Sequence, residues 1–243
     1  MESLTSRLLQ NRKQRNLNEA TKEKKRDKLR ILIVSKSEDN HTVKRIVEDA
    51  KKLGHEVFVV DILGAFITYE KNTHKIYNIS EGEGFDISSQ DTIAIIRATV
   101  KDKISYLDLL SQLEKIGICM INSRETVDIC ADKYRTYLKL QEYGLTQPKT
   151  SLISSVAHKD VAIESLDTKY PVIMKTLSGS KGVGVLFVES ERSYDSLVQL
   201  LHNQNPNVDL LVQEYIKTDK DIRVIVLGGQ IITAMESLIV QFP

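Results

Sequence analysis

A strand, a helix and a second strand follow one another within residues 30–62, and this order constrains the fold more than any other feature of the sequence. RILIVS at 30–35 is a short run rich in β-branched residues, and HEVFVVDI at 55–62 is another. Residues 41–54 between them have a helical pattern that ends at Gly54. Strands joined in this way run parallel through a right-handed crossover. The sequence therefore predicts a parallel α/β sheet.

Similar elements continue to residue 122. The segment 67–80 resembles a hairpin that turns at Lys71-Asn72, and EGEGFDISSQ at 81–90 reads as a loop. DTIAIIRA at 91–98 predicts a third core strand, and residues 106–117 repeat the pattern of a helix that ends in glycine. GICMIN closes this region. We expect a small α/β domain with an open sheet over residues 30–122.

The second half predicts one long helix over residues 123–144, followed by a break at Pro148. Strands are expected in TSLIS, PVIMKTL, GVLFVES and LLVQEYI, and helices near 157–167 and 191–203. The final stretch, 221–240, predicts two strands turned by Gly228-Gly229. We expect one lobe over 123–208 and the incomplete start of another over 209–243.

Charge is unevenly distributed along the chain. Residues 1–30 carry ten Lys or Arg and four Asp or Glu, so with a formal net charge of +1 overall the remainder is −5. We expect residues 1–29 to form a basic, solvated or frayed helix. The alternative is a contact with nucleic acid or the ribosome. This contact would use Arg12, Lys13, Arg15, Lys24, Lys25 and Arg26.

The composition also excludes several classes of protein. The chain has no run of about 18 apolar residues that would span a membrane and no apolar core of a signal peptide, so a cytoplasmic protein is expected. Cys119 and Cys130 lie in apolar settings, which predicts two buried, reduced thiols. The five histidines show no ligand spacing, so a histidine or cysteine metal site is not expected.

The segment KTLSGSKGVGV at 175–185 is the first candidate site. Strand alternation in PVIMKTL places Ile173, Lys175 and Leu177 on one face, opposite Val172, Met174 and Thr176. An ammonium group among apolar residues needs an anion, because its desolvation costs several kcal/mol. Gly179, Gly182 and Gly184 allow backbone amides to surround phosphate oxygens. The alternative is a surface hairpin whose Lys175 extends into solvent.

Three further segments carry a resemblance to a known family. INSRETVDICADKYRTYLKLQEYGLTQPKT has an Asn-Ser pair that leads to a helix with Asp-Lys, and PVIMKTLSGSKGVGV has a lysine strand with a glycine-rich loop. LVQEYI is followed by DIRVIVLGGQIITAM. Together they resemble the ATP-grasp ligases of the RimK type, the ribosomal-protein glutamate ligases and their relatives. The resemblance runs from about Arg30 to Met235 and implies an ATP-grasp fold with an N-terminal pre-ATP-grasp domain.

The resemblance implies a nucleotide site. Lys133 and Lys175 match the two lysines that neutralise the ATP phosphates, and the loop with Gly179, Ser180, Gly182 and Gly184 would cover them. In QEYI, Gln213 to Ile216, the main chain at Glu214 and Tyr215 would contact the adenine edge. Asp221 matches an acidic residue near the nucleotide sugar. From the residues alone, Lys133 reads equally as a solvated helix lysine, Glu214 as a strand-end carboxylate, and Asp221 with Arg223 as a surface ion pair.

The implied reaction is carboxylate–amine ligation. ATP phosphorylates a carboxylate, an amine attacks the acyl phosphate, and Mg²⁺ assists. The family's magnesium ligands would follow the final MESLIVQFP, so we expect a truncated chain with impaired turnover. The alternatives are an inactive ATP-binding remnant and an adaptor for nucleic acid or the ribosome. The expected partners are ATP, an amino-acid-like carboxylate and a protein or peptide acceptor, with a homo-oligomer also plausible.

Overall fold

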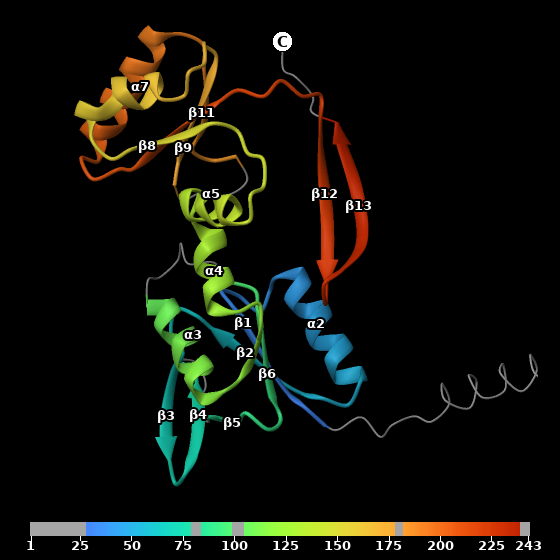
Figure 1. Cartoon of the computed structure of the whole chain (residues 1–243). Helices are drawn as coiled ribbons and strands as arrows, with labels where there is room; N and C mark the ends of the chain where they lie inside the picture. The colour runs from blue at the N-terminus through green and yellow to red at the C-terminus, as the bar shows by residue number, and fades with distance from the viewer. Residues whose placement is uncertain (1–27, 79–83, 99–104, 178–181, 239–243) are drawn as a thin grey trace, which may run out of the picture. The chain divides into compact units, whose positions relative to one another are not determined.

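The computed structural model describes residues 28–78, 84–98, 105–177 and 182–238. The expectations for residues 1–27, Gly179, Ser180 and 239–243 lie outside this part of the chain. Two compact units are formed, Met1–Thr126 and Val127–Pro243 (Figure 1). The domain boundaries expected after residues 122 and 208 stay predictions. Among the described residues, no helix combines the length and the apolar character needed to cross a bilayer.

The first unit contains the predicted parallel sheet. Its strands are β1 (Arg30–Ser35), β2 (Glu56–Asp61), β6 (Thr92–Ile96) and β7 (Cys119–Ile121), in the order β2-β1-β6-β7. Every pair in this sheet is parallel. The crossover helix α2 (His41–Lys52) begins where the side chain of Asn40 accepts a hydrogen bond from the amide of Thr42. The predicted strand–helix–strand unit is therefore confirmed.

The core of this unit lies between the sheet and its helices. Ile31 and Ile33 of β1 pack with Val43 and Ala50 of α2. The helix α3 (Ser105–Ile116) precedes β7 and buries one apolar face that includes Leu110. The continuous apolar run of β1 and the apolar face of α2 thus pack into one core.

A smaller antiparallel sheet joins β3 (Phe66–Glu70), β4 (Thr73–Tyr77) and β5 (Phe85–Ile87). The predicted hairpin turn at Lys71-Asn72 is confirmed, with φ of 48° and 64°. The loop expected over 81–90 is wrong at β5, which pairs with β4. Ile87 is buried, and Phe85 stacks on Phe58 with ring centroids 4.9 Å apart. A three-residue strand is too short for its alternation to be visible in the sequence.

The long helix expected over 123–144 is instead two helices, α4 (Arg124–Ala131) and α5 (Lys133–Glu142). Asp132 between them is extended, with φ −123° and ψ 125°. Its side chain accepts hydrogen bonds from the amides of Tyr134 and Arg135 and so caps α5. A side chain that satisfies the first amides of a new helix competes with continuation of the old one.

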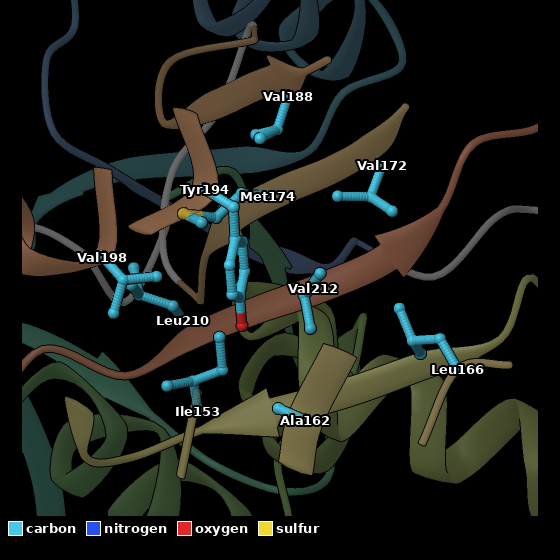
Figure 2. Packing of buried hydrophobic residues seen from close by; sticks show 10 residues of the cluster. All are labelled: Ile153, Ala162, Leu166, Val172, Met174, Val188, Tyr194, Val198, Leu210 and Val212. Carbon is cyan, nitrogen blue, oxygen red and sulfur yellow. The ribbon is translucent and has the colours of Figure 1, made fainter. Parts of the chain in front are cut away.

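The second unit is built on a four-stranded antiparallel sheet in the order β10-β9-β11-β8. Its strands are β8 (Thr150–Ile153), β9 (Val172–Thr176), β10 (Val185–Val188) and β11 (Leu210–Glu214). The 3₁₀ turn η2 (Val156–His158), α6 (Lys159–Glu164) and α7 (Glu191–Gln204) supply the helical layer. Figure 2 shows the ten buried side chains of this core, among them Val172 and Met174 from β9 and Tyr194 from α7.

The last described elements are β12 (Lys220–Leu227) and β13 (Gln230–Leu238), which form a two-stranded hairpin. Its predicted turn at Gly228-Gly229 is confirmed, with φ of 58° and 76°. All eight residues of β12 are exposed. Apolar side chains such as Ile222, Leu227 and Ile231 are therefore open to solvent on this hairpin.

Both cysteines are free thiols, but the predicted burial is wrong because both are exposed. Cys119 lies in β7, an edge strand of the parallel sheet. Cys130 is the second-last residue of α4. An apolar sequence neighbourhood therefore did not predict which face these thiols occupy, because edge strands and helix ends expose part of their surface.

Candidate functional site

Lys175 lies on β9, on the face opposite the core. Val172 and Met174 are fully buried, whereas Ile173 and Lys175 are only partly buried, so the predicted alternation is confirmed. The Nζ of Lys175 donates a hydrogen bond to Oε1 of Gln213 at 2.6 Å. Burial lowers the pKa of Lys175, and the positive charge of Lys133 lowers it further. The lysine is thus held in place with its charge only weakly solvated.

Lys133 approaches the same strand from the start of α5. Its backbone amide donates to the carbonyl of Leu177 at 3.1 Å. Its Nζ donates to the carbonyls of Thr176 at 3.0 Å and Leu177 at 3.3 Å. The cap at Asp132 sets where α5 begins and therefore where this side chain leaves the helix. Two lysines from separate elements converge at the end of β9.

A hollow of about 180 Å³ lies at this point. Its lining includes Cys130, Lys133, Thr136, Thr150, Lys175 and Gln213. Small-molecule pockets usually measure about 300–1,000 Å³. The hollow is therefore large enough for part of a nucleotide, and its two ammonium groups favour the phosphate part. The described lining residues carry no carboxylate that would cancel this charge.

The end of β11 contains the segment QEYI. Gln213 reaches the hollow, while the amide of Glu214 donates to the carbonyl of Lys149 at 3.0 Å. The carboxylate of Glu214 accepts from the amide of Lys149 at 2.7 Å, so this residue ties β11 to the chain before β8. Tyr215 packs edge-on against Phe187 with centroids 5.0 Å apart, and Ile216 is exposed. The amide of Glu214 is thus already paired.

The described part of the glycine-rich segment forms the turn into β10. Gly182 and Gly184 have φ of 80° and 78°. The carbonyl of Gly184 accepts from the amide of Thr176 at 2.9 Å. A Cβ added to Gly184 would run into the side chain of Thr176, whereas one added to Gly182 would meet open space. Close approach to β9 therefore requires glycine at 184.

Asp221 is not among the residues that line the hollow. It is exposed on β12, where its register partner is Ser237. The ion pair that the hairpin does form joins Lys220 to Glu236 at 3.1 Å. The described residues include no group of three His, Cys, Asp or Glu placed to hold a metal ion. Magnesium binding, which the family resemblance implies, stays a prediction.

Six lining residues were not predicted from the sequence as site residues: Cys130, Thr136, Tyr137, Gln147, Thr150 and Leu211. Thr150 is the register partner of Gln213 across the β8–β11 pair, and its Oγ1 accepts from Nε2 of Gln213 at 2.7 Å. Cys130 was expected in a core. Its position three residues before Lys133 was the signal in the sequence that could have placed it beside the same site. Thr150 could be placed at the site only once the pairing of β8 with β11 is known.

Two family models match the chain. The RimK PreATP-grasp domain matches residues 29–127, and the RimK-like ATP-grasp domain matches residues 130–240. Together these matches extend over most of the described chain.

Individual relatives agree with the family models. A protein of Methanococcoides burtonii named "Probable alpha-L-glutamate ligase" is 29% identical over 211 residues, which cover 86% of this chain and 67% of the relative. "Probable alpha-L-glutamate ligase 2" of Hahella chejuensis is 30% identical with the same coverage. The crystal structure of a RimK domain ATP-grasp protein from Sphaerobacter thermophilus has a TM-score of 0.65 at 19% identity, covering 85% of this chain and 72% of that one.

Proposed function

Because the chain belongs to the RimK-like ATP-grasp family and is by family a carboxylate–amine ligase, we propose that it uses ATP to join glutamate to an amino-acid or peptide partner. The choice of glutamate is supported by the names of relatives that are 29–30% identical over most of the chain. The structural observation that carries the proposal is the convergence of Lys133 and Lys175 on one hollow.

The reaction has two steps. A carboxylate oxygen attacks the γ-phosphorus of ATP, the bond to ADP breaks, and an acyl phosphate forms. The amine nitrogen then attacks the carbonyl carbon, inorganic phosphate leaves with the electrons of the C–O bond, and the amine loses a proton. In both steps negative charge builds up on the oxygens of a leaving phosphate group, so catalysis depends on positioning and on stabilisation of that charge.

Lys133 and Lys175 would supply this stabilisation. Two ammonium groups at the end of β9 attract phosphate oxygens, and the attraction is strong because Lys175 is partly shielded from water. Burial and Lys133 lower the pKa of Lys175, and a bound anion would act in the opposite direction by favouring its protonated form. The two lysines therefore bind and orient the phosphates, while the described residues assign no step to a metal ion.

The remaining predicted residues surround this centre. The loop that contains Gly179, Ser180, Gly182 and Gly184 would cover the phosphates. The main chain between Glu214 and Ile216 would contact adenine, and Asp221 would lie near the sugar. These roles rest on the family resemblance and form part of the proposal.

Binding of MgATP to the purified chain tests the first half of the proposal. Isothermal titration is expected to show binding that weakens at least about tenfold in Lys175→Met, since one lost charge contact corresponds to about 1.4 kcal/mol. Lys169→Met is the matched control, because Lys169 is exposed in the same unit. Absence of binding at millimolar MgATP would contradict the proposal.

Release of ADP tests the second half. Glutamate carries both a carboxylate and an amine, so glutamate alone can serve as both partners. We expect glutamate to stimulate ADP release more than aspartate, whose side chain is one methylene shorter. Binding without any glutamate-dependent ADP release would favour the alternative of a nucleotide-binding protein without turnover.

A further inference from the structure

Three side chains form a continuous hydrogen-bonded chain across three neighbouring strands. Thr150 lies on β8, Gln213 on β11 and Lys175 on β9, and β11 pairs with both of the other strands (Figure 1). Lys175 Nζ donates to Gln213 Oε1 at 2.6 Å, and Gln213 Nε2 donates to Thr150 Oγ1 at 2.7 Å. Thr150 Oγ1 donates in turn to the carbonyl of Pro148 at 2.9 Å.

The chemistry of these groups fixes the direction of every bond. An ammonium group carries donors only, so the oxygen of the Gln213 amide must face Lys175. The amide nitrogen then faces Thr150, whose single hydroxyl proton is already directed to Pro148. The hydroxyl oxygen can therefore only accept from Gln213. A flipped amide would place two donors against the ammonium, and its oxygen could bond the Thr150 hydroxyl only if that hydroxyl gave up its contact with Pro148.

The charged groups around Lys175 indicate what this hydrogen-bonded chain does. The titratable groups that line the hollow with it are Lys133 and Tyr137 from α5 and Cys130 from α4. From the paired strands, β10 presents Val185 at the register position of Lys175 and β11 presents Leu211. No carboxylate lies within ion-pair distance of Lys175 in the described ranges. Among the described residues, the hydrogen bond that its ammonium donates goes to a neutral amide.

We propose that Gln213 is a positioning residue that fixes the ammonium of Lys175 toward the phosphates without neutralising its charge, and that Thr150 locks the amide in the orientation this requires. This role rests on the proposed function, because it explains why the charge of Lys175 stays available to the phosphates of ATP. A carboxylate at the same position would still accept from Lys175, but it would pair with the ammonium charge and compete with phosphate for it.

Two substitutions at Gln213 separate positioning from neutralisation. Gln213→Glu keeps the shape and an acceptor, adds an opposite charge, and is expected to raise the pKa of Lys175 by at least about one unit. Gln213→Leu removes the acceptor and is expected to lower that pKa further. Both variants should weaken MgATP binding at least about tenfold, the first because the charge is cancelled and the second because the ammonium is no longer held. Thr150→Val should lower the affinity less, since the amide then flips only part of the time.

The experiment measures the reactivity of Lys175 directly, without nucleotide. Brief acetylation with acetic anhydride across a pH series, read by mass spectrometry, gives the pH midpoint at which Lys175 becomes reactive. The midpoint should rise in Gln213→Glu and fall in Gln213→Leu relative to the unaltered protein. Gln141→Glu is the matched control, because Gln141 is exposed on α5. In this variant the midpoint of Lys175 should stay at the value of the unaltered protein. Thermal unfolding of Gln213→Glu should not occur at a lower temperature than that of the unaltered protein.

Two results would overturn the positioning role. One is a Lys175 midpoint that stays the same in both Gln213 variants, and the other is MgATP affinity of Gln213→Glu equal to that of the unaltered protein. A different result separates the two proposals. Midpoints that move in opposite directions, in a chain that does not bind MgATP, would support the positioning of Lys175 and overturn the proposed function.

Discussion

The Nζ of Lys133 lies 3.0 Å from the carbonyl oxygen of Thr176, which fixes the first residue of α5 to the last residue of β9. The backbone amide of Lys133 adds a second contact to the following carbonyl, that of Leu177. The same ammonium group therefore helps to hold a helix against a strand and supplies positive charge to the hollow beside them.

The substitution Lys133→Met separates these two effects. It removes the side-chain hydrogen bonds, so the free energy of unfolding should fall by about 1 kcal/mol, and affinity for MgATP should fall at least about tenfold. Urea unfolding and isothermal titration measure the two quantities. Lys139→Met on the same helix should change stability by less than about 0.5 kcal/mol, because its ion pair with Glu142 and its contact with the Tyr143 ring both lie on the exposed surface. Equal effects of the two substitutions would contradict the role of Lys133.

The lowered pKa of Lys175 predicts a proton linked to nucleotide binding. Phosphates favour the ammonium form, so binding raises this pKa from its lowered value toward or beyond lysine's usual value of about 10.4. Between the free and bound values, binding takes up a proton, and affinity falls as pH rises. Titrations above pH 8 in buffers of different ionisation enthalpy measure the uptake. Lys175→Met should abolish it, and equal uptake by that variant would assign the proton to another group.

The same lowered pKa has a defined effect on stability. The unfolded chain binds the Lys175 proton more tightly than the folded chain, so this residue makes stability rise with pH between its folded pKa and about 10.4. Below the folded pKa both states carry the proton, so the unfavourable contribution of the charged Lys175 is fully present and no longer changes with pH. Lys175→Met should therefore flatten this part of the stability profile when unfolding is followed without nucleotide.

Asp132 predicts a helix-capping effect. Its side chain accepts from the amides of Tyr134 and Arg135 at 2.8 and 2.9 Å. Asp132→Ala should lower the free energy of unfolding by about 1 kcal/mol, whereas Asp132→Asn, which retains a capping oxygen, should cost much less. Circular dichroism during urea unfolding provides the comparison. If alanine and asparagine cost the same, the cap is not what ends α4 and starts α5.

Alanine substitution should lower stability by different amounts at Gly184 and Gly182. Both have positive φ, which costs an L-residue about 1–2 kcal/mol. Gly184→Ala should cost more than Gly182→Ala, because its Cβ would collide with the side chain of Thr176. Adding Thr176→Ala should recover part of the excess in Gly184→Ala and none in Gly182→Ala. Thermal unfolding of the four variants measures this coupling, and an equal cost at both glycines would refute the close approach.

The elements that sequence predicts well are those whose signal is local. The β-branched run RILIVS, the alternation in PVIMKTL, and the turns at Lys71-Asn72 and Gly228-Gly229 depend on neighbouring residues and were confirmed. The ATP-grasp fold with its pre-ATP-grasp domain was confirmed through the resemblance and the family models. The misread segments were β5, which exists because β4 offers an edge, and the break at Asp132 inside a helical pattern.

The candidate site divides in the same way. Lys133, Lys175 and Gln213 could be named from short motifs, and the structure places all three around one hollow. Their roles in binding ATP stay predictions. Thr150 could not be named, because its contact with Gln213 spans 63 residues and depends on which strands are neighbours. The exposure of Cys130 likewise depends on how the end of α4 meets the sheet.

The size of the hollow, about 180 Å³, has a consequence for the choice among nucleoside triphosphates. The hollow is too small for a whole nucleotide, and its charged groups are two ammonium groups. Such a site would contact the phosphates and would not distinguish a purine with an amino group from one with a keto group. In the proposed function, discrimination between ATP and GTP would then depend on the main chain that follows Gln213. Substitution of either lysine would lower the affinities for ATP and GTP by the same factor and leave their ratio unchanged.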